Sequence, residues 1–400
     1  MLTFAATLRQ EQDPADAARA AVQEILAQLG GRPCHLAVLF VSHRYRTDWV
    51  PILREIRQTL GNPLLIGCTA GGVLGREEEV EGAAALSLAA ASLPRVELHP
   101  FTVSPEDLAE ARGPGWWIEQ LGATPGEEPV GILLPEPFTC DVMTLMAALN
   151  ATYPKMPLIG GLASGAQQAG ENHLFINDEV RQEGAIGVLL TGDVTLQTIV
   201  SQGCRPVGRP YIVTGVEENV ILELAGMPAT EALRQLFAAL PVQDRALAQH
   251  ALFLGVVMHE QQAAFQRGDF LIRNLIGIDP DRGALAVGDR VHVGQTVQFQ
   301  LRDAATARDD LGHLLGEQAQ ALTQPPAAGA LLFSCLGRGQ DLYGEPSYDT
   351  RTIQAAVGHR PLAGFFCNGE IGPVGGRNFV HGFTASLGLF RPKTSPKSAA

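Results

Sequence analysis

One local pattern recurs three times along the chain, and it constrains the fold more than any other feature of the sequence. Each copy begins with proline, continues as a short apolar run and ends in a glycine-containing turn, and the copies lie at 63–72, 157–165 and 361–370. A second apolar run precedes each copy, and these runs lie at 35–42, 130–135 and 329–336. Runs of this length are typical of strands that are buried on both faces.

The segment between the two runs has the pattern of an amphipathic helix in each copy. In the first copy, Asp48 is a candidate N-cap, and five apolar residues within 49–60 share one helical face. The second copy has an apolar stripe within 142–149, and the weaker helix of the third copy ends at Gly358. Strand, helix and strand form a βαβ unit with a right-handed crossover, so we expect three such units with parallel strands.

Further strands are predicted after each glycine turn, so the sheets should combine parallel and antiparallel strands. A strand near 96–99 that leads to a helix resembles another near 297–300, which suggests an internal duplication with its join between Cys204 and Pro210. We therefore predict an α/β fold with α+β character, built from two related halves that each hold a mixed β-sheet with flanking helices. The predicted segments are an N-terminal helical segment at 1–32, a first domain at 33–205, a second domain at 206–391 and a disordered tail at 392–400.

The charge balance and the cysteines limit the class of protein. The formal net charge is −13, from 29 basic and 42 acidic residues, which argues against a nucleic-acid partner because such a partner requires a basic face. No apolar run is long enough to cross a bilayer, so no membrane insertion is expected. The N-terminal residues lack the pattern of a secretory signal. The six scattered cysteines are therefore expected to be reduced thiols, which favours the cytoplasm.

Familiar catalytic and cofactor motifs are incomplete in this sequence. The zinc-protease motif that begins at His259 lacks its second histidine, because Ala263 stands in that position. The dinucleotide loop that begins at Gly337 has Leu342 in place of its third glycine. No Gly-Lys dipeptide occurs, which excludes a P-loop. We therefore predict no catalytic residue, no metal site and no cofactor.

The most promising cluster of polar residues follows the two strands of the third unit. Since the carboxyl ends of parallel strands meet at one edge of a sheet, residues from both strands are expected to line one crevice there. Glycine turns expose backbone amides at such an edge, while Arg338 and Glu370 offer opposite charges for a zwitterionic ligand. The predicted ligand-binding residues are Cys335, Arg338, Cys367, Asn368, Gly369 and Glu370, with Arg302 and Asp303 at the rim.

These residues also have structural interpretations. Cysteines at strand ends are usually small buried apolar residues, and Arg338 with Glu370 can form a structural ion pair. Asp303 is first of all a candidate helix N-cap, and His381 is more simply a core histidine. The secondary site candidates are Cys68 and Ser164, which occupy corresponding turns in the first half and suggest a second pocket there, and His381.

Taken together, these motifs resemble the FIST family (F-box and intracellular signal transduction), with its N-terminal and C-terminal domains in tandem. The resemblance covers about 35–391 and is most specific at 364–390; the other specific stretches are 66–72, 157–165, 297–303 and 333–339. It implies a FIST N-terminal domain at 33–205 and a FIST C-terminal domain at 206–391. It also implies a sensory module that binds a small ligand, such as an amino acid, and signals through a partner protein.

Three functions remain open at this point. The first is a small-ligand-binding sensory protein that acts with a signalling partner. The second is an enzyme that uses Cys367 or Cys335 as its nucleophile, which requires a base such as His381 or His359 within reach. The third is a protein-interaction scaffold, which a large apolar surface patch favours.

Overall fold

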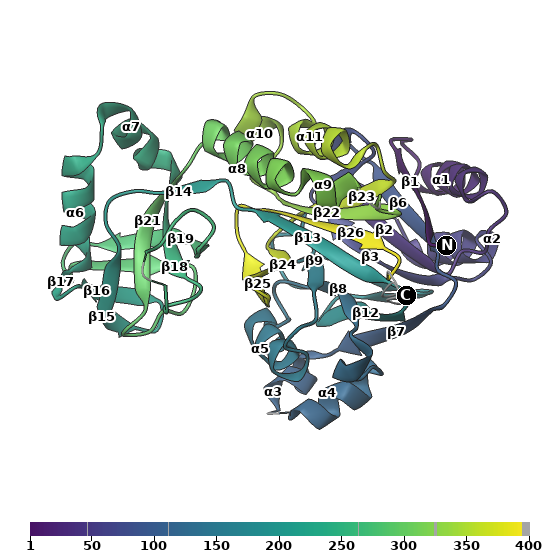
Figure 1. The fold of residues 1–400 in the computed structure, drawn as a ribbon, viewed down its shortest axis with the longest axis horizontal. Helices are drawn as coiled ribbons and strands as arrows, with labels where there is room; N and C mark the ends of the chain where they lie inside the picture. The colour runs from purple at the N-terminus through teal and green to yellow at the C-terminus, as the bar shows by residue number, and fades with distance from the viewer. Residues whose placement is uncertain (46, 111, 263, 324–325, 394–400) are drawn as a thin grey trace, which may run out of the picture. The chain divides into compact units, whose positions relative to one another are not determined.

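The computed structural model describes residues 1–45, 47–110, 112–262, 264–323 and 326–393. The chain divides into two compact units (Figure 1). The first unit holds Met1–Val200, Leu314–Val380 and the residues from Thr384 onward, and the second unit holds Ser201–His313 and His381–Phe383. Of the predicted disordered tail, only Pro392 and Lys393 are described, so the rest of that prediction lies outside the described residues.

Three six-stranded sheets build the described part of the first unit, and each contains a parallel pair of strands. The first sheet has the order β1 (Thr3–Arg9), β6 (Leu86–Ser92), β2 (Leu36–Ser42), β3 (Leu64–Ala70), β10 (Leu174–Ile176), β11 (Glu179–Arg181). The second sheet has the order β7 (Val96–Val103), β12 (Ala185–Gly192), β8 (Val130–Pro135), β9 (Leu158–Gly161), β24 (Glu370–Val374), β25 (Arg377–His381). The third sheet has the order β13 (Thr195–Ser201), β26 (Ala385–Arg391), β22 (Gly329–Cys335), β23 (Leu362–Cys367), β4 (Val73–Gly75), β5 (Glu78–Val80).

Each parallel pair is a βαβ unit, as the sequence predicts. The crossover helix is α2 (Trp49–Thr59) in the first sheet and α5 (Val142–Thr152) in the second, and α10 (Gln340–Tyr343) and α11 (Tyr348–Val357) take this place in the third. The predicted N-cap Asp48 accepts a hydrogen bond from the Val50 amide. The α/β class with mixed sheets and flanking helices is therefore confirmed.

The proline-led strands occupy equivalent positions in the three sheets. Gly67, Gly160 and Gly364 each pair with a leucine of the preceding parallel strand. A Cβ atom at these glycines would lie 1.9, 1.9 and 1.8 Å from the carbonyl oxygen of that leucine, so only glycine fits. Each of the three repeats therefore consists of a βαβ unit and the hairpin that follows it.

The hairpin of each repeat joins the sheet of another repeat. Hairpin β4–β5 of the first repeat extends the third sheet, β10–β11 of the second repeat extends the first, and β24–β25 of the third repeat extends the second. The internal repeat is thus threefold and lies within the first unit. The two segments that the sequence analysis compared lie in different units, 96–99 in β7 of the first and 297–300 in β21 of the second.

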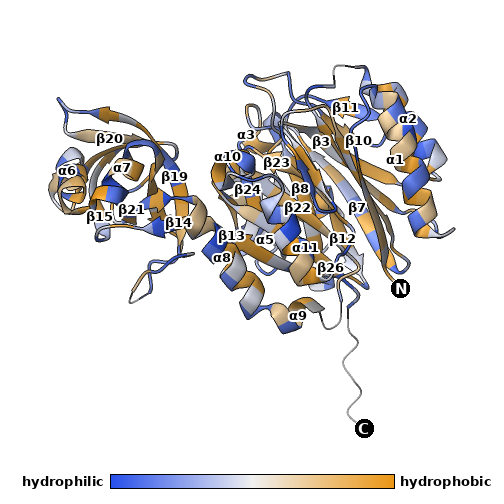
Figure 2. Ribbon diagram, turned by 90° about the horizontal axis from the view of Figure 1, so that it is seen from above, coloured by the Kyte–Doolittle hydropathy of each residue, from blue (hydrophilic) through white to orange (hydrophobic). Residues whose placement is uncertain are grey.

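The core of the first unit lies between the three sheets. Alternate residues of β2 point to opposite faces, so Leu36, Val38 and Phe40 enter this central cluster. The intervening Ala37, Leu39 and Val41 pack under α1 (Pro14–Leu29) and α2 instead. This burial of both faces explains the continuous apolar runs in the sequence. Figure 2 shows both hydrophilic and hydrophobic colours on α1 and α2, as expected for helices that cover a sheet.

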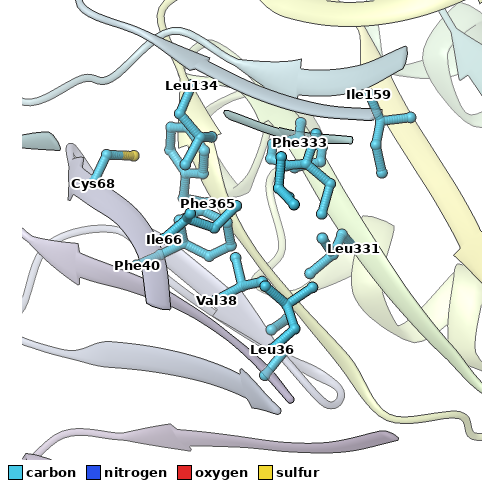
Figure 3. Packing of buried hydrophobic residues seen from close by; sticks show 14 of the residues in the cluster. Leu36, Val38, Phe40, Ile66, Cys68, Leu134, Ile159, Leu331, Phe333 and Phe365 are labelled. Atoms are coloured by element: carbon cyan, nitrogen blue, oxygen red, sulfur yellow. The ribbon is translucent and has the colours of Figure 1, made fainter. Parts of the chain in front are cut away.

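Aromatic rings from two repeats fill the centre of this core (Figure 3). The rings of Phe40 and Phe365 have centroids 4.7 Å apart, and Phe333 packs edge-on against both, at 6.0 and 5.7 Å. Phe40 and Phe333 occupy equivalent positions, one residue beyond the leucines that pair with Gly67 and Gly364. The repeats therefore share one continuous core. Helices α5 and α4 (Pro114–Leu121) cover the outer face of the second sheet, and the short α3 (Pro105–Ala109) precedes α4 in the chain.

The second unit is an antiparallel barrel in the described residues. Its strands follow the order β14 (Cys204–Pro206), β21 (Thr296–Arg302), β15 (Tyr211–Glu217), β16 (Val220–Leu224), β20 (Ala284–Val287), β19 (Phe270–Asp279), β18 (Leu252–Val257), with β17 (Met227–Pro228) beside β16. Pairing of β18 with β21 closes the sheet. Helices α6 (Ala229–Ala239) and α7 (Val242–Ala251) belong to this unit, while α8 (Ala304–Glu317) and α9 (Ala319–Thr323) lead back to β22.

Within the described ranges, every helix is too short or too polar to cross a bilayer.

Candidate functional site

The cysteines of the third repeat lie side by side but are not exposed nucleophiles. Cys335 and Cys367 are partners in the register of β22 and β23. Cys367 is fully buried, and this burial raises the pKa of its thiol well above the ordinary value. None of the six cysteines, all of which are described, forms a disulfide.

Arg338 does not form an ion pair with Glu370, as the sequence suggested, but with another acidic residue. Its guanidinium is fully buried and bonds both oxygens of Asp349, with Nε–Oδ2 at 2.7 Å and Nη2–Oδ1 at 2.9 Å. Tyr343 also donates to Asp349, at 2.7 Å. Glu370 is buried elsewhere, where it accepts a hydrogen bond from the Thr384 amide at 3.0 Å. The Arg338–Glu370 pair is therefore corrected to Arg338–Asp349, because α11 begins beside β22 and brings its own carboxylate.

The remaining predicted residues of the third repeat, Asn368 and Gly369, form backbone hydrogen bonds to the second repeat. Asn368 is exposed and donates its amide to the Leu162 carbonyl at 3.2 Å, and the Gly369 carbonyl accepts from the Leu162 amide at 2.9 Å. These bonds join the third repeat to the second.

The predicted rim residues Arg302 and Asp303 and the candidate His381 belong to the second unit. Asp303 is the N-cap of α8, since its Oδ1 accepts from the Thr306 amide at 2.7 Å. Burial opposes ionisation of Asp303, but the hydrogen bonds from Thr306 and Arg205 outweigh it and lower its pKa. His381 is buried, and the Arg302 guanidinium lies 5.0 Å from the Phe383 ring centroid.

Ser164 and Cys68 lie in the first unit near the point where the three repeats meet. The Thr69 carbonyl accepts from the Ser164 amide at 3.2 Å, as the Leu162 carbonyl does from Asn368. Each of these bonds forms a junction between two repeats. At the third junction, between the third and first repeats, the Ser164 hydroxyl donates to the Phe366 carbonyl and accepts from the Gly71 amide. Ser164 thus closes a ring of strand ends, while Cys68 is fully buried in the central core.

A cavity of about 350 Å³ opens beside this ring, between the first and second repeats. It lies at the carboxyl ends of β2 and β3, which is the usual place for a ligand in folds with parallel strands. Its lining includes His43, Tyr45, Thr69, Gly165, Glu171, His173 and Gln182. We call it the His43–His173 pocket.

The His43–His173 pocket has polar side chains at positions where the two equivalent junctions of the ring have apolar side chains or glycine. Equivalent positions in the three repeats are identified by the register of the parallel strands and by the backbone hydrogen bonds between hairpin and strand. Thr69 stands where the other repeats have Leu162 and Phe366, His43 where they have Pro137 and Leu336, and His173 where they have Gly369 and Gly72. Only one of three equivalent junctions therefore carries hydrogen-bonding side chains at these positions.

Hydrogen bonds define the protonated nitrogen of each imidazole. His43 Nδ1 lies 3.2 Å from the Ala70 carbonyl, which can only accept, so Nδ1 carries the proton and Nε2 is an acceptor in the neutral ring. The Gln182 amide nitrogen lies 3.2 Å from His173 Nε2 and also bonds the Gly170 carbonyl. His173 Nε2 therefore accepts, and its Nδ1 is a donor. Burial lowers the pKa of His173, which favours this neutral form.

A long connection in the second repeat shapes the pocket. Residues 165–173 link the turn to β10, and the link is anchored where the His173 amide donates to Thr69 Oγ1 at 2.9 Å. The side-chain amide of Asn172 donates to the buried Glu136 carboxylate at 3.0 Å. A Cβ at Gly165 would lie 2.8 Å from the His43 ring, so glycine lets the imidazole pack there.

His43, Thr69 and His173 are not among the site residues predicted from the sequence, although the adjoining Ser164 is. One available signal was Thr69, because the other two proline-led copies have the apolar Leu162 and Phe366 at this position. The extra length of 165–173 relative to the other two turns was a second signal.

Comparison with known proteins identifies the family. The FIST N domain matches residues 35–227, and the FIST C domain matches residues 229–373. An uncharacterized protein of Mycobacterium tuberculosis (strain CDC 1551 / Oshkosh) is 40% identical over 94% of this chain and 95% of its own length. An uncharacterized protein of Mycobacterium bovis (strain ATCC BAA-935 / AF2122/97) is 39% identical over 94% of this chain and 96% of its own.

Among solved structures, a cyanuric acid hydrolase from A. caulinodans covers 98% of this chain and 100% of its own, at 9% identity and a TM-score of 0.33. A likeness of that size is too weak to transfer a fold or an activity. The two domain matches together span most of the chain. The chain therefore belongs to the FIST family of sensory and signal-transduction domains, with its N and C domains in tandem.

Proposed function

We propose that this protein is a sensor that binds a small polar metabolite, such as an amino acid, in the His43–His173 pocket. The observation that carries the proposal is the change from apolar to polar side chains at one of three equivalent junctions. A purely structural junction does not need these groups, since the other two close without them. The pocket volume also falls within the range of small-molecule sites, about 300–1,000 Å³.

The polar groups of the pocket suit a zwitterion. The His173 Nδ1–H group can donate to a carboxylate, while His43 Nε2 and the exposed Glu171 carboxylate can accept from an ammonium group. No described residue hydrogen-bonds the second nitrogen of either imidazole. A ligand of this chemistry therefore finds a donor and two acceptors without breaking an internal bond.

Two substitutions test this assignment with little change to the fold. His43→Asn keeps a donor for the Ala70 carbonyl and removes Nε2, and His173→Gln keeps an acceptor for Gln182 and removes Nδ1. Each should weaken binding at least about tenfold, since a hydrogen bond to a charged group contributes about 1.5–3 kcal/mol. His359→Asn is the matched control, because His359 is exposed and pairs with Glu77.

The measurement is a thermal-shift screen of the twenty amino acids, followed by calorimetric titration of each hit. A ligand at about 100 times its Kd should stabilise the wild-type protein by about 2.7 kcal/mol. If both pocket variants bind a hit as tightly as the wild type, the pocket assignment is wrong. If none of the twenty stabilises the wild type, amino acids are excluded as the ligand class.

A second role, docking of a signalling partner, is favoured by exposed aliphatic side chains on the second unit. Ile276 and Ile278 both lie on β19 and are 60% and 58% exposed. Ile212 and Val293 of the same unit are also exposed. The double variant Ile276→Ser/Ile278→Ser should lose the partner and keep the ligand, as measured by co-purification and by calorimetry.

The cysteine-dependent enzyme is the weaker alternative, because burial keeps the Cys367 thiol protonated at neutral pH. The six unbridged cysteines fit a reducing compartment, and we include the cytoplasm in this proposal on that ground.

A further inference from the structure

A second cavity, of about 440 Å³, lies in the first unit at the amino ends of β8 and β9. Three segments meet there: the loop 125–130 before β8, the loop 153–157 between α5 and β9, and the start of β13 at 194–196. Lys393, just after β26, completes the lining. The ring of strand ends and the His43–His173 pocket lie at the carboxyl ends of the parallel strands, so the two cavities are separate.

The walls of this cavity are apolar and rigid. Prolines at 125, 129, 154 and 157 line it, and they have neither an amide N–H nor freedom in φ. Tyr153 adds an aromatic ring, with its hydroxyl bound to the Ala123 carbonyl at 2.7 Å, and Met156 and Leu196 add aliphatic atoms. Walls that are already fixed lose little conformational entropy when a ligand binds.

The charged groups at the cavity are two lysines and one glutamate. The chain has only three lysines and a net charge of −13, yet Lys155 and Lys393 both line this cavity. Glu128 accepts a hydrogen bond from Lys393, and this bond, with the charge of Lys155, lowers its pKa. One carboxylate thus faces two ammonium groups, and the Lys155 ammonium has no hydrogen-bond partner among the described residues.

We propose that this cavity, the Lys155–Lys393 cavity, is a second binding site and takes a small organic anion with a carboxylate head and an apolar body. Lys155 binds the carboxylate, assisted by Lys393. The proline, tyrosine and methionine walls take the apolar body. Such a site serves a sensor as an input distinct from the zwitterion pocket.

Benzoate, benzamide and benzylammonium are suitable probes, because they share one ring and differ in charge. Ligand-detected NMR titration of the full chain should show that benzoate binds and that benzamide and benzylammonium bind at least about fivefold more weakly, as a loss of about 1 kcal/mol of charge attraction requires. Lys155→Met should weaken benzoate binding by a similar factor, and Lys155→Arg should restore it in part. Arg282→Met, which removes an exposed positive charge from the second unit, is the matched control and should bind benzoate as the wild type does.

Glu128→Gln provides a test in the opposite direction. It removes the carboxylate that competes for Lys393, so benzoate should bind more tightly, by about fivefold on the same reasoning. The proposal is overturned if benzoate and benzamide bind equally well, if Lys155→Met binds benzoate as the wild type does, or if benzoate does not bind at all. Substitutions at His43 and His173 should not affect benzoate, which separates this site from the first.

Discussion

The Ser164 hydroxyl accepts a hydrogen bond from the Gly71 amide, 2.9 Å away, and thereby links the turns of the second and first repeats. It donates at the same time to the Phe366 carbonyl of the third repeat. At the other two junctions an amide and a carbonyl meet directly. One hydroxyl therefore completes a ring that backbone groups nearly close by themselves.

Ser164→Ala should destabilise the fold by about 2–4 kcal/mol, because the buried Phe366 carbonyl and the partly buried Gly71 amide lose a hydrogen-bond partner. Chemical denaturation followed by tryptophan fluorescence measures the change. Asn368→Ala is the matched control, since Asn368 has the equivalent place in the third repeat with an exposed side chain, and it should cost less than about 0.5 kcal/mol. Equal losses in the two variants would show that the bridge has no special role.

Asp349→Asn should cost about 3–5 kcal/mol, because the buried Arg338 guanidinium loses its counter-charge. The double variant Arg338→Met/Asp349→Leu should recover much of this loss, as expected for a buried pair that apolar groups can replace. Urea unfolding of the single and double variants measures both effects. A double variant as unstable as the single one would contradict this account of the pair.

Glu79 should make the stability depend on pH. Burial and the charge of Asp349 raise its pKa from 4.5 to about 7 in the folded chain. The folded state therefore holds a proton that the unfolded state has released, so stability falls as pH rises from about 4.5 to 7 and then levels off. The loss is of the order of 3 kcal/mol.

In Glu79→Gln this pH-dependent loss should be absent, so the variant should gain on the wild type between pH 5 and pH 8. Urea unfolding at both pH values gives the comparison. If wild type and variant respond alike to pH, Glu79 titrates normally in the folded protein.

The six thiols should all react with a thiol reagent in denaturant without prior reduction. In the native protein the half-buried Cys335 should react before the fully buried Cys68 and Cys367, whose pKa values burial raises. Cys335→Ser should remove the fast phase. A shortfall of two thiols in denaturant would reveal a disulfide that the structure lacks.

The sequence predicted the local units well because their signals are local. The paired apolar runs, the helical stripes and the glycine-containing turns identified the βαβ units and their equivalence. The exchange of hairpins between repeats, and the barrel inserted between β13 and β22, depend on pairings distant in sequence, which no periodicity reveals.

The candidate site was harder to predict. The partner of Arg338 is Asp349, which lies in α11. The site was predicted from residues at strand ends, so a helical residue such as Asp349 was not a candidate. The pocket at His43 lay one repeat away from the favoured cluster, beside Ser164. Its polar residues stand out only once Gly67, Gly160 and Gly364 fix the alignment of the repeats.

The central claim, that a small ligand binds between His43 and His173, is tested most directly by the histidine ring protons in an NMR titration. His43→Asn and His173→Gln assign the two signals. When the strongest hit of the amino-acid screen is added, these two signals should shift with one common Kd, and the ring signals of exposed His359 should stay unchanged. If the hit binds while the His43 and His173 signals remain fixed, the ligand binds elsewhere and the account is wrong.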